Sequence, residues 1–317
     1  MTNAAIQISS VNKRFGRTHA VRDLDLVVPT GSVCGFLGPN GAGKSTTIRM
    51  IMSIIYPDDG QIEVLGSSAL ANKDKIGYLP EERGVYRKMK VGSFLEYIGT
   101  LKGVEKSTLR TRIADWLERI ELPHVAKQRC EELSKGMQQK VQFLAAIIHD
   151  PDLVILDEPF SGLDPVNAQL LNTLIREMHE SGKTIIFSTH VLHQAEQICD
   201  RFFLINHGVK LLDATLDEIH TTFDPRTIVV EPVNGAAHFD QIPGVRSVRS
   251  SESDPRLELE IADDADPHAI MRSVMDGGPV KSIARRQLSM DEVFIRLVRE
   301  GGGEEAADQA REDLSHV

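Results

Sequence analysis

The first 66 residues alternate between apolar and polar positions in short runs, a pattern typical of β-strands with one buried face. The runs are Ala5–Ile8, Leu24–Val28, Ser32–Leu37 and Gln61–Leu65. Before the last run, Lys44–Ile55 has apolar residues at helical spacing and leads into the turn-forming sequence Tyr56-Pro57-Asp58-Asp59-Gly60. We therefore expect three strands, a helix and a fourth strand in this part of the chain.

The central part of the chain changes to helical periodicity. From about Val91 to Asp150, apolar residues recur at helical spacing, which predicts helices over Val91–Leu101, Thr108–Ile120 and Lys135–Ile148. Strand and helix patterns then alternate from Leu153 to Leu212. Such alternation indicates parallel βαβ units and therefore an α/β fold.

The last third of the chain has a different pattern. The predicted order of elements is strand, helix, strand, strand, helix, strand, which suggests a small ferredoxin-like domain followed by a further helix. These elements are Thr227–Val233, Ala237–Ile242, Val245–Ser250, Leu257–Ile261, Pro267–Met275, Val280–Arg286 and the final helix Met290–Arg299. Residues 301–317 contain three glycines and five acids, so we expect a disordered acidic tail.

Composition and charge narrow the class of protein. The chain has 317 residues and a formal net charge of −10 without a long basic run, which argues against a nucleic-acid partner. No apolar run reaches the roughly 18 residues that span a bilayer, and the N-terminus does not resemble a signal peptide. The cysteines Cys34, Cys130 and Cys199 lie far apart. We interpret them as reduced thiols of a cytoplasmic protein.

A glycine-rich loop follows the third predicted strand. Its pattern Gly38-x-x-x-x-Gly43-Lys44-Ser45 is that of a phosphate-binding loop, or P-loop. Backbone N–H groups and the start of the following helix attract anionic oxygens, Lys44 is placed to reach the β- and γ-phosphates, and Ser45 offers a hydroxyl to Mg²⁺. The alternative is an ordinary glycine-rich turn. The predicted nucleotide-binding residues are Gly38, Pro39, Asn40, Gly41, Ala42, Gly43, Lys44, Ser45 and Thr46.

Two acids end a second buried strand. The run Leu153–Leu156 is wholly apolar and is followed by Asp157 and Glu158. Carboxylates at the C-terminal end of such a strand lie where α/β sheets bind ligands. Asp157 is suited to hold Mg²⁺ through a water, and Glu158 to accept a proton from an attacking water. The alternative is a pair of acids that cap the next turn.

Together with three further motifs, these features make residues 5–220 resemble an ABC-type ATPase, the ATP-binding subunit of an ABC transporter. The further motifs are Leu133-Ser134-Lys135-Gly136-Met137 as the signature, Ser161-Gly162-Leu163-Asp164, and Ser188-Thr189-His190. The resemblance implies a P-loop ABC ATPase core with a helical subdomain. We expect this domain over residues 1–220, with the helical subdomain at about 84–150, a C-terminal α+β accessory domain over 221–300, and the tail over 301–317.

The resemblance also implies roles for residues outside the P-loop. Ser134, Lys135 and Gly136 would contact the γ-phosphate of ATP bound to a second copy, although Ser134 also suits a helix N-cap. His190 would sense the γ-phosphate and orient the catalytic site, although a lone histidine is usually structural. Asp164 would connect the two ATP sites or simply begin a turn. Phe15 would stack on adenine or end a strand in the core.

This chain departs from the family pattern at two motifs. Glu81 follows Tyr78-Leu79-Pro80 where the family usually has glutamine, so it would either bind Mg²⁺ more strongly or lie back from it. In the signature, Lys135 and Met137 replace the usual glycine and glutamine. The stretch 77–86, the signature region and the sequence 288–294 resemble the subset of the family that serves ABC-2-type export permeases, including sodium-extrusion-like systems.

The implied function is hydrolysis of Mg²⁺-bound ATP by a homodimer that encloses two ATP molecules and drives a separate integral membrane permease. The subunit would be cytoplasmic and peripheral on the inner face of the membrane. We expect Val85, Tyr86 and Met89 to form part of the permease contact. The alternative is a soluble ABC-type ATPase that acts on ribosomes or DNA, but the chain has a single cassette and no long coiled-coil insertion.

Overall fold

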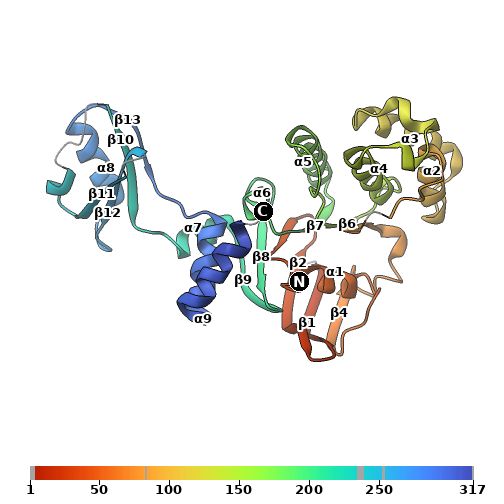
Figure 1. The fold of residues 1–317 in the computed structure, drawn as a ribbon, viewed down its shortest axis with the longest axis horizontal. Helices are drawn as coiled ribbons and strands as arrows, with labels where there is room; N and C mark the ends of the chain where they lie inside the picture. Colours follow the sequence, from red (N-terminus) through yellow and green to blue (C-terminus); the bar gives the residue numbers. More distant parts are fainter. Residues whose placement is uncertain (1–3, 83, 234–238, 252–253, 316–317) are drawn as a thin grey trace. The chain divides into compact units, whose positions relative to one another are not determined.

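The computed structural model describes residues 4–82, 84–233, 239–251 and 254–315. The chain divides into two compact units, one formed by residues 1–216 together with 294–317, the other by 217–293. The larger unit contains a six-stranded sheet, a three-stranded sheet and most of the helices (Figure 1). Among the described residues, no helix is long and apolar enough to cross a membrane.

The six-stranded sheet places the P-loop and the paired acids side by side. Its order is β5-β6-β7-β3-β8-β9, and all neighbours are parallel except β8 and β9. Every residue of β3, β6 and β7 is buried, as expected for strands covered on both faces. The strands are β3 (Val33–Leu37), β5 (Ile76–Leu79), β6 (Leu153–Asp157), β7 (Thr184–Thr189), β8 (Arg201–Asn206) and β9 (Val209–Thr215).

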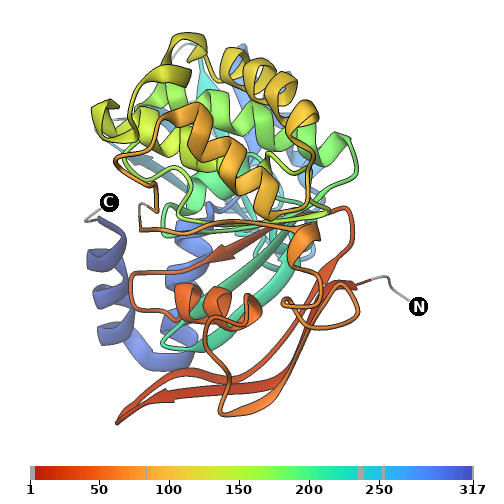
Figure 2. The ribbon, with the colours of Figure 1, turned by 90° about the vertical axis from the view of Figure 1, so that its right-hand side faces the viewer.

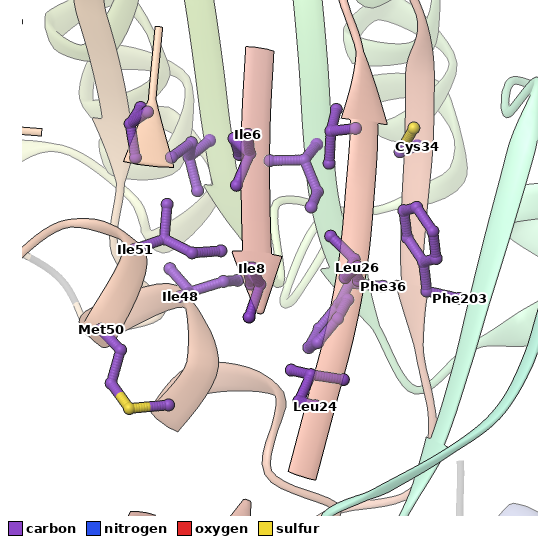
Figure 3. Close-up of a cluster of buried hydrophobic side chains, with 14 of the residues drawn as sticks. Ile6, Ile8, Leu24, Leu26, Cys34, Phe36, Ile48, Met50, Ile51 and Phe203 are labelled. Carbon is purple, nitrogen blue, oxygen red and sulfur yellow. The ribbon is translucent and has the colours of Figure 1, made fainter. Parts of the chain in front are cut away.

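A separate three-stranded sheet shares a core with the helix that follows the P-loop. Its antiparallel order is β2-β1-β4, formed by β1 (Ala4–Phe15), β2 (Thr18–Pro29) and β4 (Asp59–Val64). The helix α1 (Lys44–Ile51) contributes Ile48, Met50 and Ile51 to a core that also contains side chains from β1, β2, β3 and β8 (Figure 3). The apolar side of α1 thereby anchors the helix that begins at the P-loop lysine.

The helices of the central region match the predicted positions within a few residues. They are α2 (Val91–Leu101), α3 (Lys106–Arg119) and α4 (Lys135–Ile147), and they are followed by α5 (Pro165–Glu180) after β6 and α6 (Leu192–Glu196) after β7. Short 3₁₀ turns cover Lys73–Lys75, Pro123–Lys127 and Cys130–Glu132. The helix predicted over Lys44–Ile55 ends earlier, at Ile51, because Ser53 adopts a left-handed conformation with φ 55°.

The smaller unit has the predicted ferredoxin-like topology. Its antiparallel sheet has the order β11-β12-β10-β13 and packs an apolar core that includes Ile228, Leu259 and Val274. The elements are β10 (Thr227–Pro232), a 3₁₀ turn (Phe239–Gln241), β11 (Val245–Ser251), β12 (Asp254–Ile261), α8 (Pro267–Asp276) and β13 (Val280–Arg285), preceded by α7 (Leu216–Thr222). The start of the helix predicted over Ala237–Ile242 lies outside the described residues.

The prediction of a disordered tail is wrong for the part of residues 301–317 that the structure describes. Helix α9 runs from Met290 to Ser315 and bends at Gly303, which has a left-handed φ of 78° (Figure 2). Two features that composition does not reveal stabilise the part of α9 after Gly303. Ala307 and Ala310 are buried, and Glu304 pairs with arginines on both sides of the bend. The boundary between the units also falls within α9, before Phe294, and not at residue 300.

The packing of β5 against α4 gives a prediction for stability. A Cβ added to Gly77 would lie 2.2 Å from the carbonyl oxygen of Ala146, whereas one added to Gly84 would meet nothing closer than 3.8 Å. We expect Gly77→Ala to lower the free energy of unfolding by about 1–3 kcal/mol because the backbone must shift. Chemical denaturation measures the difference, with Gly84→Ala as the matched control. Equal stability of the two variants would contradict the tight packing seen here.

Candidate functional site

The P-loop has a backbone path that only glycine tolerates at two positions. Gly38 has φ 153°, and a Cβ there would lie 2.1 Å from the carbonyl oxygen of Ile205. Gly43 has φ 107°, and a Cβ there would lie 2.5 Å from the carbonyl oxygen of Ala20. The two glycines let the loop pass closely beside β8 and β2 and then turn into α1. The loop geometry thus explains why the sequence has glycine at both ends of the motif.

Lys44 lies buried at the end of this loop. Its Nζ donates to the carbonyl oxygens of Gly38 at 2.8 Å and Pro39 at 3.2 Å, and lies 3.6 Å from Oε1 of Glu158. Burial lowers the pKa of the Lys44 ammonium, while the neighbouring carboxylates, Glu158 first, oppose that shift. The lysine is therefore held by two loop carbonyls at the junction of the loop and the paired acids.

Asp157 is held by two hydroxyl groups. Its Oδ1 accepts hydrogen bonds from Ser188 Oγ at 2.5 Å and from Ser45 Oγ at 3.2 Å. Its Oδ2 is buried and has no hydrogen-bond partner among the described residues. Burial raises the pKa of Asp157, and the hydrogen bonds from Ser188 and Ser45 counteract part of that effect.

Glu158 begins a loop with an unusual backbone conformation. It has φ 49°, a left-handed value that costs a non-glycine residue on the order of 1–2 kcal/mol. Its carboxylate lies between Lys44 and His190, whose Nδ1 is 3.0 Å from Oε1, at ion-pairing distance but without hydrogen-bond geometry. The side chain is 9% exposed, so the structure shields the carboxylate from bulk water. Such strain at a buried acid is typical of functional sites.

The residues predicted to bind Mg²⁺ converge in the structure. Ser45 Oγ lies 3.2 Å from Asp157 Oδ1 and 3.5 Å from Oε2 of Glu81, so Glu81 does approach the site. The unpartnered Oδ2 of Asp157 provides an acceptor that a hard cation would satisfy. In the described part of the chain, no cluster of three or more His, Cys, Asp or Glu forms a complete metal cage. The Ser45 hydroxyl and the carboxylates of Asp157 and Glu81 are oxygen donors of the kind that suits Mg²⁺, which usually keeps ligands from water and nucleotide phosphates.

A cleft of about 490 Å³ opens beside these residues. It contains most of the predicted nucleotide-binding loop together with Glu81 and Glu158. The β1–β2 hairpin and the β8–β9 turn form a second wall of the cleft, which the sequence did not predict. The turn signal Asn206-His207-Gly208 and the basic segment after Phe15 were visible in the sequence. The missed residues are Arg17, Thr18, His19, Ala20, Arg22 and His207.

The predicted site residues that do not line this cleft include Phe15, Ser134, Asp164 and His190. Phe15 is 49% exposed and carries the Lys13 ammonium 5.4 Å from its ring centroid. Ser134 accepts a hydrogen bond from Met137 N at 3.3 Å and so caps α4. Asp164 similarly caps α5 through Asn167 N at 3.0 Å. His190 does not line the cleft but contacts Glu158 behind it.

Lys135 and Gly136 extend the surface that begins at Ser134. Ser134 and Lys135 are exposed, and Gly136 is half-buried. None of the three lines the cleft that contains the P-loop. Within one chain, the P-loop and the signature therefore belong to separate surfaces.

Comparisons with known proteins identify both parts of the chain. A family model described as ABC transporter matches residues 21–161, and one described as ATP-binding protein DrrA1-3-like, C-terminal domain, matches residues 215–298. An uncharacterised ABC transporter ATP-binding protein of Alkalihalophilus pseudofirmus is 39% identical over 83% of this chain and 98% of its own length. The Nod factor export ATP-binding protein I of Rhizobium sp. strain N33 is 33% identical over 94% of this chain and 98% of its own length.

A solved structure supports the same assignment. The structure of an ATP-binding subunit of an ABC transporter superposes with a TM-score of 0.65 at 30% identity, and covers 69% of this chain and 93% of that chain. It confirms the predicted P-loop ABC ATPase core, and the second family model accounts for the C-terminal domain. The chain therefore belongs to the family of ABC transporter ATP-binding proteins.

Proposed function

We propose that this protein is the ATP-hydrolysing subunit of an ABC-2-type exporter, which dimerises around two ATP molecules and drives a separate membrane permease. The observation that carries the proposal is the convergence of Lys44, Asp157 and Glu158 at the end of the P-loop cleft. ATP binding and hydrolysis are what membership of the family implies. The arrangement of the site supports specific roles for these residues.

Glu158 is the general base of this proposal. Its carboxylate is shielded from bulk water, lines the cleft and lies 3.6 Å from the P-loop lysine. It accepts a proton from water as that water attacks the γ-phosphorus, and the bond from phosphorus to the ADP oxygen breaks to release inorganic phosphate. His190, 3.0 Å from the same carboxylate, fixes its orientation. Lys44 and the loop amides stabilise the charge on the phosphate oxygens.

Mg²⁺ would be held by Ser45 and Asp157, with Glu81 as the third group. The unpartnered buried oxygen of Asp157 and the approach of Ser45 to both acids support this assignment. When bound, the ion neutralises charge on the β- and γ-phosphate oxygens. The protein's own contribution is to hold the two carboxylates and the hydroxyl in place before the nucleotide arrives.

Two copies of the chain are needed for a complete site. Ser134, Lys135 and Gly136 do not line the cleft of their own chain, and the exposed Ser134 caps the N-terminus of a 13-residue helix. A helix N-terminus favours an anion such as the γ-phosphate. A twofold homodimer brings this surface over the P-loop of the partner and closes both sites at once.

The permease contact is proposed on the aromatic surface of the helical subdomain. Tyr86 is 52% exposed, and its ring lies 5.9 Å from that of Phe94 and 5.7 Å from that of Tyr97. Val85 and Met89 beside it are half-buried, and Leu101 on α2 is exposed. This apolar surface begins only a few residues after Glu81, so a permease bound there would respond to changes at the Mg²⁺ ligands.

Export is favoured over import by the relatives whose names state a direction. The relative from Rhizobium is named for Nod factor export, and it aligns over nearly the whole chain, including the C-terminal domain. A permease partner would place this subunit on the cytoplasmic face of the membrane. A soluble ribosome- or DNA-directed ATPase has no support in the matched families.

The role of Glu158 gives the first functional prediction. Glu158→Gln keeps the shape of the side chain but removes the base, so turnover should fall by about 10²–10⁴-fold while ATP still binds. Size-exclusion chromatography with Mg²⁺ and ATP should show a dimer of Glu158→Gln. Glu63→Gln, at an exposed position of β4, serves as the control. Wild-type turnover by Glu158→Gln would exclude Glu158 as the general base.

The composite site gives a prediction for mixed variants. Lys44→Ala removes the P-loop cation, and Ser134→Asp keeps the helix cap but opposes phosphate with a negative charge. Each variant alone should be inactive, whereas an equal mixture should recover about a quarter of wild-type activity, because half of the dimers contain one intact site of two. Steady-state ATP hydrolysis measures the recovery. A mixture as inactive as its components would contradict the shared site.

A charged residue placed at Tyr86 tests the proposed permease contact. Tyr86→Glu should reduce recovery of a multi-span membrane protein with the affinity-tagged subunit by about tenfold, since a buried charge is costly in an apolar interface. Tyr56→Glu is the matched control, because Tyr56 is 66% exposed but follows α1 at a distance in sequence from the helical subdomain. Quantitative mass spectrometry of the purified complex compares the two. Undiminished recovery with Tyr86→Glu would exclude this surface.

A further inference from the structure

Ser188 is the only described side chain that hydrogen-bonds to both members of the acidic pair, Asp157 through its carboxylate and Glu158 through its backbone. Its Oγ donates to Asp157 Oδ1 at 2.5 Å and accepts from Glu158 N at 3.1 Å. The carbonyl oxygen of Ser188 lies 3.2 Å from the same Glu158 N–H. The residue is fully buried, with 0% exposure, so water does not replace these bonds.

The strand register explains why Ser188 occupies this position. In the parallel pairing of β6 with β7, Asp157 lies opposite Ser188. The chain leaves β6 after Asp157, and Glu158 turns into the left-handed conformation with φ 49°. The donated Glu158 N–H remains bonded to Ser188 through this turn, so the unfavourable conformation keeps a buried donor satisfied.

We propose that Ser188 is a positioning residue for ATP hydrolysis: its single hydroxyl fixes both the Asp157 carboxylate and the strained backbone of Glu158. With Oδ1 occupied by Ser188 and Ser45, Oδ2 of Asp157 is left as the unpartnered acceptor for Mg²⁺. The bond to Glu158 N sets the direction in which that side chain leaves the backbone, toward Lys44 and His190. The inference rests on the roles proposed above for the two acids.

The same strand provides a matched control. Thr184 begins β7, is 1% exposed, and accepts a hydrogen bond from Gly31 N at 2.8 Å through its hydroxyl. Thr184→Val and Ser188→Ala therefore each remove one buried hydroxyl from β7. Only Ser188 contacts the acidic pair, so a difference between the two variants reports on the site and not on the stability of the strand.

The experiment compares wild type, Ser188→Ala, Ser188→Thr and Thr184→Val by steady-state ATP hydrolysis. We expect Ser188→Ala to lower kcat by about 10–100-fold with little change in KM, as is typical for loss of a group that orients a metal ligand. Ser188→Thr, which keeps the hydroxyl, should recover most of kcat, and Thr184→Val should leave it unchanged. A Ser188→Ala kcat equal to that of wild type, or an equal loss in Thr184→Val, would overturn the inference.

A second measurement does not depend on turnover. The Mg²⁺ concentration that half-maximally raises the melting temperature with a non-hydrolysable ATP analogue should increase about tenfold in Ser188→Ala and remain unchanged in Thr184→Val. Unchanged Mg²⁺ dependence in Ser188→Ala would overturn the part of the inference that concerns Asp157. If Ser188→Ala does not fold, Ser188→Cys replaces it, since a thiol is a weak donor of similar volume. Wild-type kcat in Ser188→Cys would likewise overturn the inference.

Glu158→Gln, measured in parallel, separates this inference from the proposed function. An inactive Glu158→Gln beside a fully active Ser188→Ala would overturn the role of Ser188 alone. Wild-type turnover by Glu158→Gln would overturn both the proposed base and the positioning role derived from it. Loss of activity in Glu158→Gln and in Ser188→Ala, with Thr184→Val intact, supports both.

Discussion

The buried cluster of charge at the C-terminal end of β6 is the constraint on which the rest of the site depends. Asp157, Glu158 and Lys44 are each less than a tenth exposed, and removing a charge from water without compensation costs several kcal/mol. The compensation comes from separate elements: carbonyls of the P-loop, a hydroxyl at the start of α1 and a hydroxyl in β7. The six-stranded sheet brings these elements together because β6, β7 and β3 are neighbours.

This arrangement prepares the site for anions and cations before either binds. The lysine is neutralised in part by Glu158 at 3.6 Å, an interaction that a triphosphate would compete with. Asp157 has one oxygen engaged and one free of partners, which suits a metal ion that keeps some of its water. The P-loop reaches this position only because Gly38 and Gly43 allow its backbone to pass within contact distance of Ile205 and Ala20.

The sequence predicted the fold and the core of the site better than it predicted the surroundings. The P-loop, Asp157 and Glu158 follow strands so apolar that their position at the sheet edge could be read directly, and the structure brings them together as expected. Arg17, Arg22 and His207 were missed because their approach to the cleft depends on a hairpin and a turn that pack against the P-loop. Such long-range contacts leave no periodic signal.

The prediction of a disordered tail over residues 301–317 was wrong for a related reason. Its glycines and acids match the composition of disordered segments, yet Ala307 and Ala310 supply the small buried face that a bent helix needs. Likewise, the sequence predicted a role for His190 in the motif Ser188-Thr189-His190, but none for Ser188. Only the pairing register of β6 with β7 shows that its hydroxyl reaches both acids.

The separation of the signature surface from the cleft has a mechanical consequence. One chain positions Lys44, the proposed base Glu158 and the proposed metal ligands, but Ser134 lies on another surface, where it caps its own helix. In the proposed dimer, the γ-phosphate would be the group that both surfaces contact, so its cleavage would weaken the interface and the catalytic site in one step. Rigid positioning of Asp157 and Glu158 within each chain is then a requirement for the switch, since a loose base would uncouple closure from hydrolysis. In the proposed dimer, the doubly bonded Ser188 would supply that rigidity inside the chain, and the interface would supply the movement between chains.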